Sequence, residues 1–428
     1  MSAANISRVH SRRVWDSRGR PTVEADVLLT GGAIGRAIAP AGASRGAREA
    51  VDRRDGGARF GGFGVARAVA NVNDLIAPEI AGLDACNQFA VDATLIRLDG
   101  TPDKSRLGAN ATVAVSLAVA HAAAAARRIP LWRHLAGDGR VGLPLPEIQI
   151  FGGGAHAARA LDLQDVMVMP VGATTFADAL AMVAEIYRTA GQLMADAGKL
   201  AGVADEGGFW PAFSSNEEAL ATVVTAIERA GYRPGHDAAL SLDIAASELM
   251  RDGRYVLALD GRTLDRDAMG EMLLGWLDRY PIASIEDPFG EDDRDGWIAF
   301  AGACGHRVQI IGDDLLTTHA PHVVQAAADR SCNAVLLKVN QAGTLTETKA
   351  AFDAARNAAF GTIVSARSGE TEDVSIAHVA VGWNAGQVKV GSFARSERMA
   401  KWNELLRIEE ALAGAASYAG ATALAYRP

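Results

Sequence analysis

Short apolar runs alternate with amphipathic stretches through the second part of the chain. There are eight such runs, at residues 145–151, 166–170, 240–244, 282–287, 308–314, 334–339, 362–367 and 387–391. Between most of them apolar residues recur at helical spacing, for example Phe176, Leu180 and Val183. Strands buried on both faces have continuous apolar runs, and eight strands that alternate with helices are typical of a β/α barrel. An open doubly wound sheet is the structural alternative, but no G-x-G-x-x-G follows an early strand.

The first part of the chain has a different pattern. Residues 6–29 have the pattern of strands, with turn residues at Gly19 and Pro21, and helical periods follow as far as residue 126. The next segment, residues 137–146, is rich in Gly and Pro and has the composition of a linker. We therefore predict an α/β protein with a smaller N-terminal α+β domain, residues 1–136, and a C-terminal eight-stranded β/α barrel, residues 137–428, that holds the active site.

Charge and cysteine content narrow the class of protein. Of the 428 residues, 42 are Lys or Arg and 51 are Asp or Glu, and the resulting net charge of −9 argues against a nucleic-acid partner. Cys86, Cys304 and Cys332 lack the spacing of a disulfide framework or a metal site. The N-terminus has no signal-peptide core, and the alanine-rich stretch 111–126 is too short to span a bilayer. We expect a soluble, cytoplasmic protein with no membrane partner.

Charged residues stand at the C-terminal ends of six consecutive predicted strands. They are Asp243, Glu286 with Asp287, Asp313 with Asp314, Lys338, Arg367 with Ser368, and Lys389. Catalytic groups of β/α barrels occupy these strand ends. A structural ion pair would explain any one of the charges, but six in succession favour a site. Three carboxylates without His or Cys indicate a hard cation, Mg²⁺ more than Zn²⁺.

The two lysines of that set indicate the substrate and the base. Lys338 and Lys389 would face the cation, so we expect an anionic substrate. A lysine beside a divalent cation and a second lysine has its neutral form favoured, away from the usual pKa of about 10.4, which suits a general base. Three loops, at 39–49, 151–160 and 204–211, carry weaker signals. Taken alone, each is more typical of a linker, a mobile loop or a polar turn.

Several long motifs resemble those of enolases. They are DSRGRPTVEA (16–25), GASRGAREA (42–50), DEGG (205–208), SIEDPF (284–289), GDDL (312–315), LLKVNQAGTLTET (336–348), SARSGETED (365–373) and RSERMAKWNELLRIEE (395–410). The match runs in order over nearly the whole chain. The resemblance implies an N-terminal three-stranded meander with helices, followed by a barrel whose first two strands are not both parallel. The muconate and mandelate branches fit poorly, because they place a lysine pair on an early strand and residues 166–170 contain no lysine.

The resemblance also implies a reaction. By motif position, Asp243, Glu286 and Asp313 resemble the ligands of a tightly held Mg²⁺, and a second Mg²⁺ would arrive with the substrate. Lys338 resembles the base that removes the alpha proton of 2-phosphoglycerate. Glu206 resembles the acid that helps hydroxide leave, so that phosphoenolpyruvate and water form.

Further positions of the resemblance complete the expected site. Arg367 with Ser368 would hold the phosphate, and Lys389 the carboxylate of the substrate. His156 resembles the family's loop histidine, and Gln164 with Asp165 occupies its Gln-Glu pair. We therefore expect His156 and Asp165 to act with Lys338 and Glu206 in catalysis. The expected substrate-binding residues are Gln164, Arg367, Ser368, Lys389 and Arg45.

Several positions depart from the enolase pattern. Ala366 replaces the histidine beside the acid, Ala41 replaces the serine that ligates the second Mg²⁺, and Arg45 replaces a threonine. Arg20 and Arg159 are further added arginines. A roomier and more cationic pocket would suit a bulkier or more anionic substrate. The alternative is that the new arginines are solvated on the surface.

Three functions remain open from the sequence. The first is the enolase reaction itself. The second is that of a paralogue resembling carboxyphosphonoenolpyruvate synthase of phosphonate natural-product biosynthesis, with the same enolate chemistry on a phosphonate carboxylate. The third is a non-catalytic binding protein, against which the intact carboxylate trio and both lysines argue. The resemblance further predicts a homodimer in which Glu24 and Arg407 form an ion pair across the subunits.

Overall fold

The N-terminal part of the chain is a three-stranded antiparallel sheet packed on a long helix. The structure is a computed structural model that describes residues 2–158, 160–415 and 417–426. The strands β1 (Ile6–Trp15), β2 (Pro21–Leu29) and β3 (Ile34–Ile38) pair in that order. Between β1 and β2 the Asp16 carboxylate accepts hydrogen bonds from the backbone N–H groups of Arg18 and Arg20, at 2.9 and 2.8 Å, and Gly19 takes a φ of +70°. The expected meander is confirmed.

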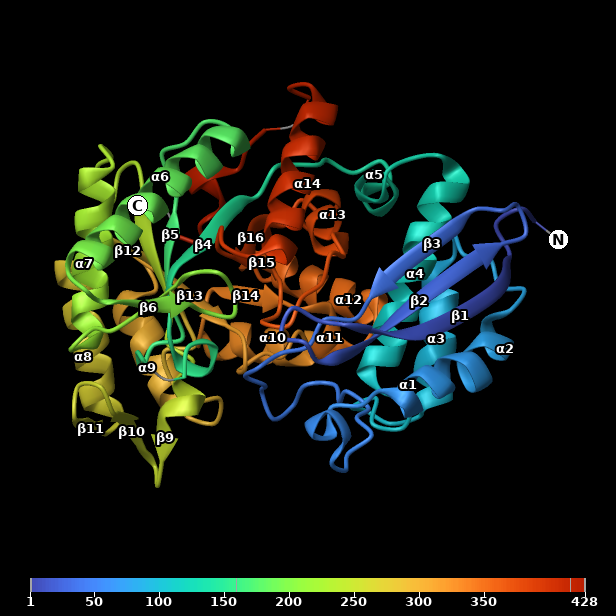
Figure 1. Ribbon diagram of the computed structural model, residues 1–428, viewed down its shortest axis with the longest axis horizontal. Helices are drawn as coiled ribbons and strands as arrows, with labels where there is room; N and C mark the ends of the chain where they lie inside the picture. Colours follow the sequence, from blue (N-terminus) through green and yellow to red (C-terminus); the bar gives the residue numbers. More distant parts are fainter. Residues whose placement is uncertain (1, 159, 416, 427–428) are drawn as a thin grey trace.

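Helix α4 (Ala109–Arg127) forms the core of this region and packs against β2 and β3 (Figure 1). It is long and apolar enough to cross a membrane by length and composition, so the expectation that this stretch is too short was wrong. However, 83% of its most apolar window is buried inside the protein, as in a core helix. The other elements here are η1 (Arg59–Gly62), α1 (Ala66–Ala70), η2 (Asn71–Ile76), α2 (Ala77–Ile80), α3 (Gln88–Asp99) and α5 (Leu131–Ala136).

Eight strands close into a barrel in the second part of the chain. In order they are β4 (Leu145–Gly152), β5 (Asp165–Met169), β8 (Ala239–Asp243), β12 (Ile282–Glu286), β13 (Gln309–Gly312), β14 (Ala334–Leu337), β15 (Gly361–Ser365) and β16 (Gly386–Gly391). Neighbours in this order pair, and β16 pairs with β4 to close the ring. Strand β5 is antiparallel to both β4 and β8, whereas the other barrel pairs are parallel. The predicted fold class is confirmed, including the direction change in the first two strands.

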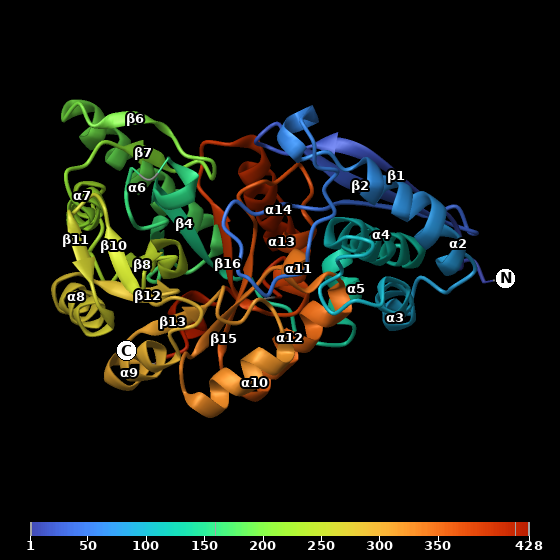
Figure 2. The same cartoon turned by 90° about the horizontal axis from the view of Figure 1, so that it is seen from below.

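Helices surround the barrel, as the two views show (Figures 1 and 2). They are α6 (Phe176–Asp196), α7 (Asn216–Arg229), α8 (Arg266–Arg279), α9 (Arg294–Cys304), α10 (Ala320–Asp329), α11 (Val339–Ala342), α12 (Leu345–Asn357), α13 (Ser375–Gly382) and α14 (Ser396–Leu412). Short 3₁₀ turns are η3 (Gly154–His156), η4 (Ala246–Leu249) and η5 (Gly420–Ala423). A small outer sheet contains β9 (Met250–Arg251), β10 (Arg254–Leu257) and β11 (Arg262–Leu264).

A hairpin that the sequence did not predict extends the barrel sheet beside β4. Its strands are β6 (Leu200–Val203) and β7 (Phe209–Pro211), and β7 pairs with β4 through Phe209 and Phe151. The segment 205–208, interpreted from the sequence as a polar turn between two helices, is the turn of this hairpin. Its position next to the first barrel strand places the segment at the barrel.

The N-terminal end of the barrel, which we call the floor, is closed by the last segment of the chain. The Gln309 side-chain amide donates to Ser284 Oγ at 3.0 Å and to Gln387 Oε1 at 2.9 Å. The Gln387 amide in turn donates to the carbonyl of Ala423 in η5, at 2.9 Å. All three side chains are fully buried, so these neutral hydrogen bonds satisfy polar groups that water does not reach.

The N-terminal domain is fastened to the barrel at the start of α12. Thr344 caps this helix, since its Oγ1 accepts from the Glu347 N–H at 3.2 Å. The carboxylate of Asp92, on α3, accepts from the Thr346 N–H and hydroxyl at 2.9 and 2.6 Å. Ser116 Oγ, on α4, accepts from the Leu345 N–H at 3.0 Å. Side chains from the first domain therefore satisfy the free N–H groups of a barrel helix.

Candidate active site

The C-terminal end of the barrel, which we call the mouth, gathers lysines and carboxylates. Lys389 Nζ lies 2.8 Å from Asp243 Oδ2, 2.8 Å from Glu286 Oε2 and 3.3 Å from Asp165 Oδ2. Strand register explains the grouping, because Asp243 pairs with Glu286 on one side and with Asp165 on the other. Asp165 reaches the mouth although it begins its strand, because β5 runs antiparallel. All four residues are buried.

The second lysine is held in a network of its own. Lys338 Nζ lies 2.5 Å from Asp313 Oδ2, and the Lys338 N–H donates to Thr318 Oγ1 at 2.9 Å. The Gln341 amide donates to Asp313 Oδ1 at 2.8 Å, while the Thr318 hydroxyl donates to Gln341 Oε1 at 2.6 Å. The ammonium and its carboxylate therefore have little freedom to move.

The neighbouring carboxylates favour the charged form of both lysines. Burial is the largest single influence on the pKa of Lys338 and lowers it, but the carboxylates of Asp313 and Glu286 act together in the other direction, so the pKa is raised overall. The neutral amine is thus disfavoured, because a carboxylate 2.5 Å away stabilises the ammonium. For Lys389, Asp243 and Glu286 also outweigh burial and raise its pKa well above the ordinary value.

Negative charge remains in excess at the mouth. Four carboxyl groups, from Asp165, Asp243, Glu286 and Asp313, face the two lysines. Burial and the neighbouring charge of Asp243 raise the pKa of Glu286 well above its ordinary value. Glu286 Oε1 is buried and has no hydrogen-bond partner among the described residues. An oxygen-only donor set with surplus negative charge fits a hard divalent cation such as Mg²⁺.

The expected metal trio is not gathered tightly. Among the described residues, the groups of three whose ligand atoms all lie within 4.8 Å of one another are His156–Asp165–Glu206 and Asp287–Asp313–Asp314. The trio of Asp243, Glu286 and Asp313 is not such a group. Its members instead bond the lysines, since Lys389 contacts Asp243 and Glu286 while Lys338 contacts Asp313.

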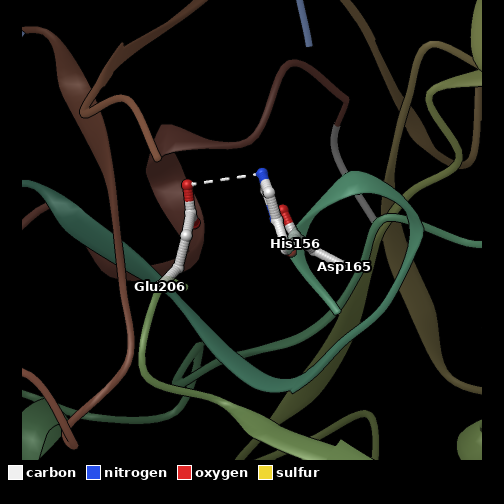
Figure 3. A group of neighbouring side chains, drawn as sticks. All are labelled: His156, Asp165 and Glu206. Atoms are coloured by element: carbon white, nitrogen blue, oxygen red, sulfur yellow. Dashed lines mark hydrogen bonds and ion pairs between the residues drawn. The ribbon is translucent and has the colours of Figure 1, made fainter. Parts of the chain in front are cut away.

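A histidine lies between two carboxylates beside β4. His156 Nδ1 is 3.1 Å from Asp165 Oδ1, and His156 Nε2 is 3.8 Å from Glu206 Oε1 (Figure 3). His156 comes from η3 in the β4–β5 loop, and Glu206 from the β6–β7 turn. Burial lowers the pKa of His156, but Glu206 and Asp165 outweigh burial and raise it. This arrangement, which we call the acid side, favours an imidazolium that can supply a proton.

Arginines from both domains meet at the phosphate side of the expected site. Arg367 Nη1 donates to Glu49 Oε2 at 2.9 Å, and Arg367 Nη2 donates to the carbonyl of Ser44 at 2.9 Å. Arg18 Nη1 donates to Ser368 Oγ at 3.2 Å. The two Arg367 contacts hold loop 41–50 of the first domain over the mouth. Arg367 and Ser368 therefore lie beside the lysines' strands, as expected, but their polar groups bond protein partners.

Comparison with known families decides what the chain is. Residues 6–135 match the family described as Enolase, N-terminal domain, and residues 140–427 match Enolase, C-terminal TIM barrel domain. The chain belongs to the enolase family. It is an enzyme of the enolase superfamily and of the lyase type, and that family generally uses Mg²⁺.

The departures from the usual enolase pattern have clear positions. The Ala41 N–H donates to the Gly369 carbonyl at 2.9 Å and its carbonyl accepts from the Gly369 N–H at 2.8 Å, so the loop stays docked without a serine. Ala366 is buried, and its N–H donates to the Lys389 carbonyl at 2.8 Å. Arg45 is 40% exposed and lies 3.9 Å from Glu49 on its own loop, so the structure does not bring it to the lysines. Arg159 lies outside the described residues.

Sequence reasoning missed several side chains that form contacts at the mouth. Gln164, which was expected, donates from Nε2 to Asp243 Oδ2 at 3.0 Å. The missed contacts are those of Arg18, Glu49, Gln149 and Gln341. Arg18, Glu49 and Gln341 belong to the recognised motifs and could have been taken with them. For Gln149 the signal was a polar residue inside the buried apolar run 145–151.

Proposed function

We propose that this enolase-family enzyme converts 2-phosphoglycerate to phosphoenolpyruvate and water with Mg²⁺ as cofactor. The observation that carries the proposal is the set of two buried lysines, each paired with carboxylates, on the strand ends of one barrel. A buried Lys–carboxylate cluster of this size is costly unless a ligand uses it. An anionic substrate and a divalent cation together would supply both signs of charge.

The first half of the proposed reaction is removal of the alpha proton. The proton moves to the Lys338 amine, once that amine has given up its own proton, and the electron pair stays on the substrate as an enolate. The Lys389 ammonium faces the extra negative charge. Mg²⁺ held by Asp243, Glu286 and Asp313 would add positive charge at the substrate carboxylate and so stabilise the enolate.

The second half is loss of the beta hydroxyl. The enolate electron pair forms the carbon–carbon double bond, the carbon–oxygen bond breaks, and the leaving hydroxide takes a proton from the acid side. Glu206 would supply that proton, with the His156 imidazole 3.8 Å away as its partner. Arg367 and Ser368 would bind the phosphate, after Arg367 exchanges its contact with Glu49 for the substrate.

A second candidate function rests on the small side chains at the mouth. Ala41 and Ala366 are buried at positions where the family pattern has larger polar residues, and smaller side chains there favour a bulkier acid group on the substrate. We propose as the alternative a carboxyphosphonoenolpyruvate synthase-like reaction, in which the same enolate chemistry acts on a phosphonate carboxylate.

An ultraviolet assay for enol formation from 2-phosphoglycerate tests the primary proposal. Product should appear with Mg²⁺ and be lost on chelation, and Lys338→Ala should lower kcat by about 10²–10⁴-fold because the base is missing. Lys349→Ala is the matched control, since Lys349 lies on the surface of α12 paired with Asp353 and should leave kcat unchanged. A protein inactive on 2-phosphoglycerate but active on a phosphonate analogue would replace the first candidate by the second.

We also propose a homodimer. Glu24 is buried and bonds Arg12 of its own sheet, while the exposed Arg407 has its Nη1 2.9 Å from Glu404. The expected cross-subunit pair would therefore draw Arg407 away from Glu404. Light scattering at micromolar concentration should give the dimer mass, and a monomer there would refute the proposal.

A further inference from the structure

A polar side chain lies in the middle of the apolar strand β4. Gln149 is fully buried, and its neighbours Ile148 and Ile150 belong to the hydrophobic core. A buried amide is costly unless its donor and acceptor are both satisfied. Gln149 meets that condition with two partners that both belong to the acid side.

The two bonds of Gln149 lead to two different elements. Its Nε2 donates to Asp165 Oδ1, at the start of β5. Its Oε1 accepts from the Gly208 N–H at 2.7 Å, at the end of the hairpin turn that carries Glu206. One side chain therefore connects the carboxylate that contacts His156 with the backbone that carries the expected acid.

The packing requires glycines around this amide. A Cβ on Gly208 would lie 2.5 Å from Gln149 Oε1, and a Cβ on Gly152 would lie 3.2 Å from Gln149 Nε2. Gly207, next in the turn, takes a φ of +94° and lies against the backbone of Ala394. The turn and the strand thus approach the amide more closely than side chains would permit.

Asp165 Oδ1 joins the amide to the imidazole. The same oxygen accepts from Gln149 Nε2 and lies 3.1 Å from His156 Nδ1. The other ring nitrogen, His156 Nε2, is therefore directed at Glu206 (Figure 3). Because Ala366 stands where the family has a histidine, His156 is the imidazole that the structure puts beside Glu206. Alignment of His156 with Glu206 then matters more than it would with a second ring present.

We infer that Gln149 is a positioning residue, which holds Asp165 and the 205–208 turn so that His156 and Glu206 stay aligned for proton transfer to the leaving group. This rests on the proposed function for its effect on turnover. The alignment of His156 with Glu206 that Gln149 fixes, however, is present without substrate. Alignment and turnover can therefore be measured separately.

The test compares three variants of the full-length protein. Gln149→Met removes both hydrogen bonds at nearly constant volume. Gln149→Glu keeps an acceptor for the Gly208 N–H but loses the donor to Asp165. Gln309→Met is the matched control, since it removes an equally buried amide at the barrel floor, far from the mouth.

Two readouts are taken for each variant. The first is kcat and KM for 2-phosphoglycerate, where a misaligned acid should lower kcat by about 10- to 100-fold and leave KM nearly unchanged. The second is the pair of imidazole ¹⁵N chemical shifts of His156 in histidine-labelled protein, assigned with His156→Asn. These shifts report the hydrogen bond at Nδ1 and need no substrate.

The inference predicts that both Gln149 variants shift the His156 signals and lower kcat, while Gln309→Met changes neither. Unchanged His156 signals in the Gln149 variants would overturn it, whatever happens to kcat. An equal loss of kcat in Gln309→Met would also overturn it, because the effect would then be general destabilisation. If Gln149→Met does not fold, Gln149→Glu decides. A wild-type protein inactive on 2-phosphoglycerate, with shifted signals in the variants, would refute the proposed function and support the positioning role.

Discussion

At the floor of the barrel, Gln309, Gln387 and Ser284 satisfy one another with neutral hydrogen bonds, whereas at the mouth two lysines face four carboxyl groups. At the floor each of the two amides has a partner for its donor and its acceptor. At the mouth Glu286 Oε1 and Gln164 Oε1 are buried without hydrogen-bond partners among the described residues. The same strands therefore favour folding at the floor and oppose it at the mouth. A cost to stability at the mouth is expected of a functional site.

The largest expected effect comes from removing charge at the mouth. Glu286→Gln should lower kcat at least about 10²–10³-fold, because the enolate loses a group that holds its counter-charge. In metal-free buffer the same variant should be as stable as wild type or more stable, since burial and Asp243 disfavour the Glu286 carboxylate. Enzyme kinetics and urea unfolding measure the two effects. A clear loss of stability would show that this carboxylate helps the fold and would break the contrast between the ends.

A change at the floor should have the opposite effect. Gln309→Ala removes the donor to Ser284 Oγ and both hydrogen bonds between Gln309 and Gln387, which leaves Gln387 Oε1 without its donor, and should lower the free energy of unfolding by about 2 kcal/mol. Its kcat should stay unchanged, because the floor lies at the other end of the strands from the lysines. Urea unfolding and the ultraviolet assay check the two halves of this expectation. A large fall in kcat would mean that the two ends are coupled.

The positions at the mouth that depart from the family pattern allow a third test of the contrast between the mouth and the floor. Restoring the family pattern with Ala366→His, Ala41→Ser and Arg45→Thr together should raise activity on 2-phosphoglycerate by at least about tenfold, or 1.4 kcal/mol of barrier. The reason is that Ala366 cannot hydrogen-bond Glu206, and Ala41 offers a second Mg²⁺ only its backbone. If the unmodified protein already turns over 2-phosphoglycerate at a typical enzyme rate, these residues are compensated and the second candidate function fails.

The smallest expected effect lies away from both ends, where α4 meets α13. His121 Nε2 is 2.8 Å from Ser375 Oγ; burial lowers the pKa of His121, opposed by Asp373 and assisted by His378. The folded protein then binds a proton less readily than the unfolded chain, so stability should be full above pH 6.5 and fall as the pH drops below it. His121→Gln should weaken that fall, measured by urea unfolding at pH 7.5 and 5.5.

The sequence predicted the barrel well and the site in part. Strands buried on both faces have apolar runs that stand out, so all eight were found, and the strand ends gave Lys338, Lys389 and the carboxylates. The β6–β7 hairpin was missed because its first strand, LAGV, is short and partly exposed. The ion pair between Lys338 and Asp313 was not predicted, because it depends on a distance that no sequence pattern contains. Gln149 was missed because its partners come from other segments of the chain.

The reversed direction of β5 has a consequence for how this enzyme can diverge. A hairpin joins β4 to β5 at the mouth, so Gln149, His156 and Asp165 lie within one stretch of 17 residues, 149–165, and only Glu206 comes from elsewhere. Lys338 and Lys389, with Asp243, Glu286 and Asp313, are spread over separate βα units, and Asp165 is the carboxylate that the 149–165 stretch shares with them. Changes confined to the segment 149–165 and the hairpin turn 205–208 can therefore alter the chemistry of the leaving group. The groups that we propose to form the enolate lie at the ends of several strands, so changing that half of the reaction requires matched substitutions in several units.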